Sequence, residues 1–285
     1  MCVVGDCLAA GIFYLYDLFF WLMTDFLPAS IRAALDGVHA SWLPILERGL
    51  QAVAQANPAY LPDLAASDYL PTEGRLFAAF SQPLDAVRYV LVGEGPYPRA
   101  ASATGVCFMD GAVGSLWSEK GLSKQVNRAT SLRNFMKMLL VADGQLAVEN
   151  TTGDAMSGVA QQAQMQGSSA IQQLADLQAN MVGQGFLLLN ASLVFRADVP
   201  PVKDAKAWQP FMQAVLTGLA EAAEDRGQAL PTLVLWGKIA EQLNAYPVTA
   251  RFPKAVAEHP YNLSFIGNAG MQALFGPMQL LKRAG

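Results

Sequence analysis

Four short apolar runs, separated by segments with helical spacing, dominate the hydrophobic pattern of this chain. The runs cover residues 87–92, 186–189, 232–236 and 254–257, and a turn carrying Gly, Pro or Asn follows each of them. Strands that alternate with helices imply βαβ crossovers and a parallel sheet covered on both faces. The pattern therefore predicts an α/β fold in three α/β/α layers, with a central four-stranded parallel sheet.

Between these runs, apolar residues recur at the three-to-four spacing of an amphipathic helix. Helices are expected at about 28–56, 76–80, 131–140, 208–223, 238–244 and 268–282. Thr130 or Ser131 is the predicted N-cap of the helix at 131–140. Residues 142–182 are rich in Gln, Ala, Gly, Ser and Met, which predicts an inserted, partly helical and mobile segment. We expect residues 24–285 to form a single domain that includes this insert.

The first 23 residues form an apolar leader. The run at 8–23 is interrupted by Asp17 and is shorter than the roughly 20 residues of a membrane-spanning helix. No basic region precedes it, as a signal peptide would require. We interpret residues 1–23 as a leader from a misassigned start codon, with a helix packed on the domain as the alternative. No membrane attachment is expected.

Composition and charge narrow the class of protein. With 53% hydrophobic and 15% charged residues, the chain is typical of an ordered globular protein. Its net charge is −4, yet residues 88–137 hold seven basic and three acidic side chains, a local footprint compatible with DNA contact. Cys2, Cys7 and Cys107 are too few for a disulfide framework or a four-thiolate cluster. We therefore expect reduced cysteines, a cytoplasmic location, no metal and no cofactor.

Polar residues cluster where the predicted strands end, which is where ligands bind in parallel sheets. Six segments there and nearby resemble, in order and spacing, the motifs of the family 1 uracil-DNA glycosylases, over about residues 70–281. The family's GQDPYH, GLCF, PPSLxN, LLLN, LLWG and HPSPLS correspond to GEGPYP at 93–98, GVCF at 105–108, ATSLRN at 129–134, LLLN at 187–190, VLWG at 234–237 and HPYNLS at 259–264. Leu193 and Arg196 match as well.

The resemblance implies a role for each of these residues in flipping and reading uracil. Phe108 stacks on the base, the Asn190 amide reads its O4 and N3–H, and Tyr97 excludes a 5-methyl group. His259 stabilises the leaving base at O2. Ser131 and Ser264 hold phosphates of the DNA, and Leu263 enters the duplex as the wedge. Gly93 and Gly95 complete the implied substrate-binding residues.

The chain departs from the family 1 pattern within its first motif. The aspartate that orients the water is Gly95 here, the motif's histidine is Pro98, and two prolines of the phosphate loop are Ala129 and Thr130. Loss of a positioned general base costs about 10²–10⁴ in rate. The GEGP sequence also resembles the first motif of the family 4 enzymes, which lack that aspartate; their iron–sulfur cluster requires cysteines that this chain does not have. Glu94 is therefore the candidate for positioning the water, with stabilisation of the sugar cation by the substrate's own phosphates as the alternative.

The function predicted from these residues is hydrolysis of the N-glycosidic bond of uracil in DNA, single or double stranded, by a monomeric DNA-repair glycosylase. Two alternatives fit the same residues. One is a catalytically weak or inactive protein of this fold that binds DNA or a protein partner, which Gly95 and Pro98 favour. The other is a glycosylase for a different modified base, against which Tyr97 argues.

Overall fold

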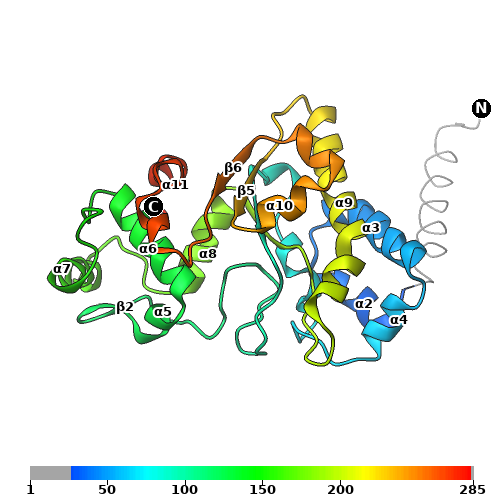
Figure 1. Ribbon diagram of the computed structural model, residues 1–285, viewed down its shortest axis with the longest axis horizontal. Coiled ribbons are helices and arrows are strands. Elements are labelled where there is room, and N and C mark those ends of the chain that lie inside the picture. Colours follow the sequence, from blue (N-terminus) through cyan, green and yellow to red (C-terminus); the bar gives the residue numbers. More distant parts are fainter. Residues whose placement is uncertain (1–26, 284–285) are drawn as a thin grey trace, which may run out of the picture.

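A central parallel sheet organises the computed structural model, which describes residues 27–283 (Figure 1). The strand order is β4-β1-β5-β6, and all three neighbouring pairs are parallel. The strands are β1 (Tyr89–Gly93), β4 (Phe186–Asn190), β5 (Thr232–Trp236) and β6 (Lys254–Ala257). All four lie within one residue or two of the predicted runs, and the three-layer α/β/α prediction is confirmed.

Helices flank the sheet on both sides, which explains why its central strands are apolar on both faces (Figure 1). One group comprises α2 (Ala29–Ala33), α3 (Leu43–Ala56), α4 (Tyr60–Ala65), α9 (Pro201–Asp225) and α10 (Ile239–Asn244). The other comprises α5 (Lys124–Arg128), α6 (Thr130–Ala142), α7 (Gly153–Gln164), α8 (Leu174–Gly183) and α11 (Ala269–Phe275). No helix in residues 27–283 is long and apolar enough to cross a membrane.

Four predicted helices differ from those observed. The helix expected at 208–223 is longer, since α9 already starts at Pro201. The segment 28–56 is not one helix, because two 3₁₀ turns, Ala34–Gly37 and Ala40–Trp42, separate α2 from α3. The short helix at 76–80 is a 3₁₀ helix, Arg75–Phe80. The last helix ends at Phe275 rather than near 282, since Gly276 and Pro277 follow and the chain turns into a short 3₁₀ segment.

The N-cap prediction for α6 is also wrong. Ala129 is both the C-cap of α5 and the N-cap of α6, and no side chain caps α6. Thr130 and Ser131 therefore lie inside the first turn. Because the two helices share one linking residue, there is no separate N-cap position for a hydroxyl, and Ser131 is left to face the carboxyl edge of the sheet.

The segment 142–182 is partly helical, as predicted, and contains α7 and α8. A capping box starts α8, with the Gln173 and Asp176 side chains exchanging bonds with each other's backbone. The segment between β1 and α5 also contains a short antiparallel hairpin that the sequence pattern did not predict. Its strands, β2 (Trp117–Ser118) and β3 (Gly121–Leu122), pack against α7. The leader at 1–23, with Cys2 and Cys7, lies outside the described residues. Cys107 is a free, buried thiol.

Candidate active site

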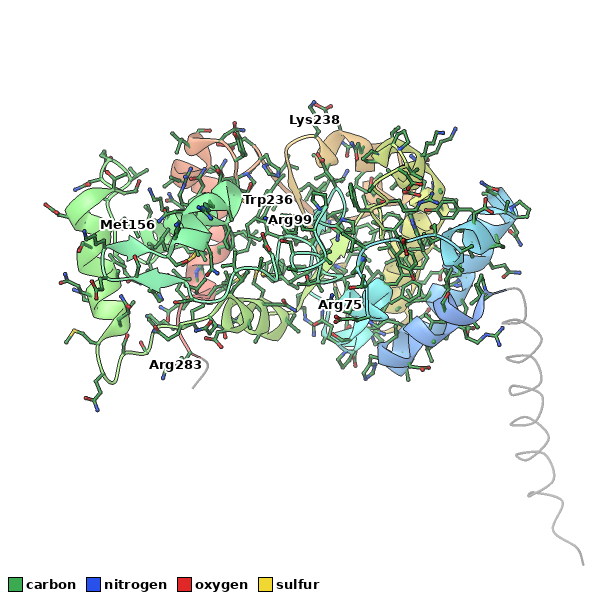
Figure 2. All side chains as sticks on the ribbon, turned by 90° about the horizontal axis from the view of Figure 1, so that it is seen from below. Arg75, Arg99, Met156, Trp236, Lys238 and Arg283 are labelled. Atoms are coloured by element: carbon green, nitrogen blue, oxygen red, sulfur yellow. The ribbon has the colours of Figure 1, made fainter. Side chains whose placement is uncertain are left out.

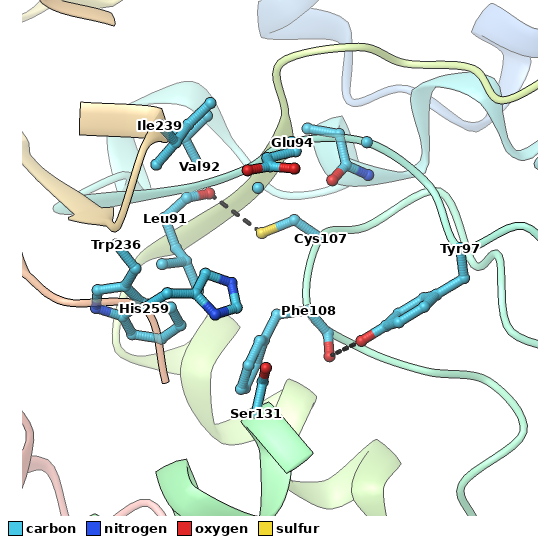
Figure 3. A pocket seen from close by; sticks show the side chains of 13 residues that line it. Leu91, Val92, Glu94, Tyr97, Cys107, Phe108, Ser131, Trp236, Ile239 and His259 are labelled. Carbon is cyan, nitrogen blue, oxygen red and sulfur yellow. Dashed lines mark hydrogen bonds between the residues drawn. The ribbon is translucent and has the colours of Figure 1, made fainter. Parts of the chain in front are cut away.

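A cavity of about 210 Å³ opens at the carboxyl edge of the sheet, where β1, β4 and β5 end (Figure 3). Eight of the ten predicted site residues line it: Gly93, Glu94, Gly95, Tyr97, Phe108, Ser131, Asn190 and His259. The same edge is where parallel sheets place their ligands. Segments that are far apart in the sequence are thus brought to one small hollow, as the strand-end pattern predicted.

Phe108 forms one wall of the cavity (Figure 3). Its ring meets those of Phe135 and Trp236 edge to face, with centroids 5.3 and 5.2 Å away. Its backbone is left-handed, with φ at +67°, a conformation that costs a residue with a side chain about 1–3 kcal/mol. The contacts with Phe135 and Trp236 fix the orientation of the Phe108 ring. The part of the ring that they leave uncovered lies toward the cavity, where a planar ligand can stack.

Asn190 ends β4 and is only 3% exposed. Its amide lines the cavity, yet no group within residues 27–283 forms a hydrogen bond with it. A buried amide without a partner costs free energy, so it is normally satisfied. This amide offers one donor and one acceptor to whatever enters the cavity.

His259 points its ring into the cavity from the loop after β6 (Figure 3). The Tyr261 backbone N–H donates to its Nδ1 over 3.1 Å, so the neutral ring carries its proton on Nε2. Partial burial lowers the pKa of His259, and the nearby Glu94 carboxylate opposes this only in part. At neutral pH the residue is thus an uncharged imidazole with a free N–H donor.

Gly237 fixes the position of His259. This residue has φ at +65°, and a Cβ there would lie 2.9 Å from the His259 Cβ. Only glycine allows the end of β5 to pass so close beneath the histidine. Lys238 follows at once and projects away from the body of the protein (Figure 2).

Glu94 and Gly95 form the exposed lip of the cavity. The Glu94 carboxylate is close enough to influence His259 electrostatically. Gly95 contributes bare backbone, and a Cβ there would meet only Ser192 atoms, at 3.6 Å. The carboxylate next to the cavity is therefore that of Glu94, one residue earlier in the chain than the position where the resemblance places an aspartate.

Tyr97 and Ser131 complete the wall. The Tyr97 hydroxyl donates to the Phe108 carbonyl at 3.4 Å, a long bond. Burial, aided by the Asp110 carboxylate, raises the pKa of Tyr97 to about 12, so the phenol is neutral. Ser131 presents a half-buried hydroxyl from the first turn of α6.

Leu263 and Ser264 do not line the cavity. They lie in the same loop as His259, at the start of a 3₁₀ turn, Leu263–Gly267, and Leu263 is 69% exposed. The Ser264 hydroxyl lies near the Glu258 carboxylate and helps to lower the pKa of that group. The two residues thus stand on the surface beside the cavity.

The sequence pattern predicts no role for Asn134, the last residue of the segment 129–134. This residue is fully buried in α6, and its Nδ2 donates to the carbonyls of Pro260, Tyr261 and Asn262 at 2.7, 3.2 and 3.4 Å. It therefore ties the loop that carries His259 to the helix that carries Ser131. A buried polar residue on an apolar helix face was the available signal.

Arg196 is a structural residue. Its guanidinium pairs with the buried Asp204 of α9 at 2.6 Å, and Asp204 also accepts from the Tyr60 hydroxyl at 2.7 Å. This network joins the exit of β4 to α4 and α9.

Comparison with known proteins agrees with this fold. No family model matches the chain. The chain is 28% identical to a uracil-DNA glycosylase of Corynebacterium glutamicum, covering 80% of this chain and 81% of that protein. It is 30% identical to one of Chlamydia abortus, covering 73% of each. The crystal structure of the UNG of Nitratifractor salsuginis superposes with a TM-score of 0.78 at 38% identity, covering 88% of this chain and 95% of that one. By fold and by sequence, this chain belongs to the uracil-DNA glycosylases, a family of glycosylase hydrolases.

Proposed function

We propose that this protein excises uracil from DNA by hydrolysing the N-glycosidic bond of a flipped deoxyuridine, the opening step of base excision repair. The observation that carries the proposal is the buried, unpartnered amide of Asn190 in one small cavity with Phe108 and His259. Uracil is planar and presents an acceptor, O4, beside a donor, N3–H. One amide can pair with both.

The leaving base is stabilised by His259. As the C1′–N1 bond breaks, its electron pair departs with the base, and negative charge develops on O2 of the uracil anion. The neutral His259 donates its Nε2–H to that oxygen. A fixed donor in a partly water-excluded cavity stabilises developing charge at little reorganisation cost.

Glu94 positions the attacking water and accepts a proton from it. A water molecule attacks C1′ as the bond to N1 breaks, and one of its protons passes to the Glu94 carboxylate and then to solvent. The same carboxylate opposes the positive charge that builds on the sugar. This role is supported by the place of Glu94 at the lip of the cavity and by its electrostatic influence on His259.

The DNA lies across the mouth of the cavity. Flipping costs a few kcal/mol of stacking, and an exposed apolar residue such as Leu263 fills the space that the base leaves. The exposed Lys124 and Arg128 of α5, directly before Ser131, supply positive charge for the phosphates. Tyr97, which lines the cavity beside Phe108, serves in this proposal to exclude the 5-methyl group of thymine.

Excision from a labelled single-stranded oligonucleotide with one uracil, cleaved by alkali at abasic sites, tests this proposal. We expect cleavage by the wild type, and at least a 100-fold slower rate for Asn190→Ala and His259→Ala. His39→Ala, which alters the other histidine at an exposed position, is the matched control and retains the rate. An intact strand at high enzyme concentration would overturn the proposal and favour a protein that binds DNA without cleaving it.

A further inference from the structure

A second hollow of about 750 Å³ adjoins the cavity, and Glu94 and Gly95 line both. It lies between the first two turns of α9 and the end of α10, with the loops after β1 and β4 forming its floor. Its size is within the range of ligand pockets, about 300–1,000 Å³. The resemblance to known glycosylases assigns nothing to this groove.

The groove combines flat apolar walls with a polar rim. Pro96, Phe195 and Tyr246 contribute the apolar surface, and Lys206, Gln209 and Gln242 the polar groups. Within the described residues none of these three polar side chains forms a hydrogen bond. Amides at a rim can pair with the edge of a base, and an ammonium group can pair with a phosphate.

Tyr246 places an unpaired hydroxyl in the groove. It is only 7% exposed, and its hydroxyl has no hydrogen-bond partner within residues 27–283. The hydroxyl is not sealed from solvent, so it can exchange water for a ligand group. Since Tyr246 lines the groove, its hydroxyl is available to a molecule bound there.

We propose that this groove binds the nucleotide next to the flipped deoxyuridine, with the base against Pro96, Phe195 and Tyr246 and a phosphate near Lys206. The inference rests on the proposed function, which places the flipped nucleotide in the adjoining cavity. One phosphodiester tethers the neighbour to it, and the shared lip at Glu94 and Gly95 is where the strand passes. Because a side chain at position 95 would project toward Ser192 on the groove floor, glycine there keeps this passage wide.

Binding of short single strands tests the groove. The probes carry a central 2′-fluorodeoxyuridine, whose fluorine disfavours the sugar cation and slows cleavage, and differ only in an abasic residue placed 5′ or 3′ of it. Fluorescence anisotropy should show about tenfold weaker binding to the wild type for one of the two abasic probes, since stacking a base on protein contributes about that factor. The side that responds identifies the neighbour.

A double variant, Gln209→Ala with Gln242→Ala, should bind the complete probe about tenfold more weakly and respond to neither abasic residue. Gln213→Ala, one turn further along α9 and outside the groove, is the matched control. Lys206→Ala should lower the slope of log Kd against log salt by about one.

The groove proposal would be refuted if the wild type bound the three probes with equal affinity. It would also be refuted if the double variant still distinguished them, or if the protein failed to bind any probe. Excision is measured separately on a deoxyuridine strand, so the two proposals can fail independently. If the protein cleaves this strand but its affinity does not depend on the neighbouring base, only the groove proposal is refuted. If the affinity depends on one neighbouring base but no strand is cleaved, only the proposed hydrolysis is refuted.

Discussion

Replacing Gly93 with alanine should disturb the candidate site through a single methyl group. Gly93 ends β1 and lies opposite Asn190 in the ladder. Its φ is outside the left-handed region, so alanine can adopt the backbone conformation. The added Cβ would lie 2.8 Å from the Asn190 Oδ1 and 2.9 Å from the Cys107 Cβ. Real Cβ atoms do not come so near, so the amide, the thiol side chain or the strand end must move.

The structure sets the expected size of the effect. Overpacking a buried site by one carbon costs about 1–3 kcal/mol, and an alanine that replaces a compatible glycine returns about 0.4–1 kcal/mol through the unfolded chain. We therefore expect the free energy of unfolding to fall by about 0.5–2 kcal/mol. A shift of the Asn190 amide by several tenths of an ångström should lower kcat/KM about 10- to 100-fold, because positioning errors near 1 Å cost about 100-fold.

Urea unfolding followed by tryptophan fluorescence measures the first quantity, and excision from the uracil oligonucleotide measures the second. Gly95→Ala is the matched control for stability, since its Cβ would make only ordinary contacts at 3.6 Å. Its unfolding free energy should stay within about 0.5 kcal/mol of the wild type. If Gly93→Ala matches the wild type in both stability and kcat/KM, the tight approach of Gly93 to Asn190 does not exist in solution and the reasoning is wrong.

Three further changes test other parts of the structure. In an NMR titration, the pKa of His259 should lie below its usual value near 6.5, and Glu94→Gln should lower it further. Because the unfolded chain then binds the His259 proton more tightly than the folded chain does, the contribution of His259 to the free energy of unfolding should fall as the pH drops below about 6.5. Urea unfolding at several pH values measures this decrease. A pKa above 6.5 would contradict the burial argument. Leu263→Ala should leave the unfolding free energy within about 0.5 kcal/mol yet weaken binding to a uracil-containing duplex, and equal binding would remove the wedge role. Asp204→Ala should lower the unfolding free energy by about 3 kcal/mol, because it leaves the partly buried Arg196 charge and the Tyr60 hydroxyl without their partner. A loss under about 1 kcal/mol would mean that water replaces the carboxylate.

The sheet and most of the cavity could be predicted from the sequence, for a shared physical reason. A strand buried on both faces must be a continuous apolar run, so the segments at 186–189 and 232–236 are visible without tertiary information. Parallel strands bring their carboxyl ends to one edge, and the residues just after the runs, such as Asn190, therefore converge. Local pattern and topology rule are enough to place them together.

Other features depended on contacts that no local pattern encodes. The role of Asn134 arises from carbonyls more than 120 residues away, and the shared cap at Ala129 arises from how α5 meets α6. The tautomer of His259 follows from one backbone N–H in its own loop.

The sequence by itself determined the order of the strands along the chain and the residues at their ends, because burial dictates the first and chain connectivity the second. Only the tertiary structure decided which polar groups remain without partners, such as the Asn190 amide and the Tyr246 hydroxyl. Hydrogen-bond satisfaction is a property of the whole surroundings of an atom, and distant segments supply or withhold those partners when the chain folds.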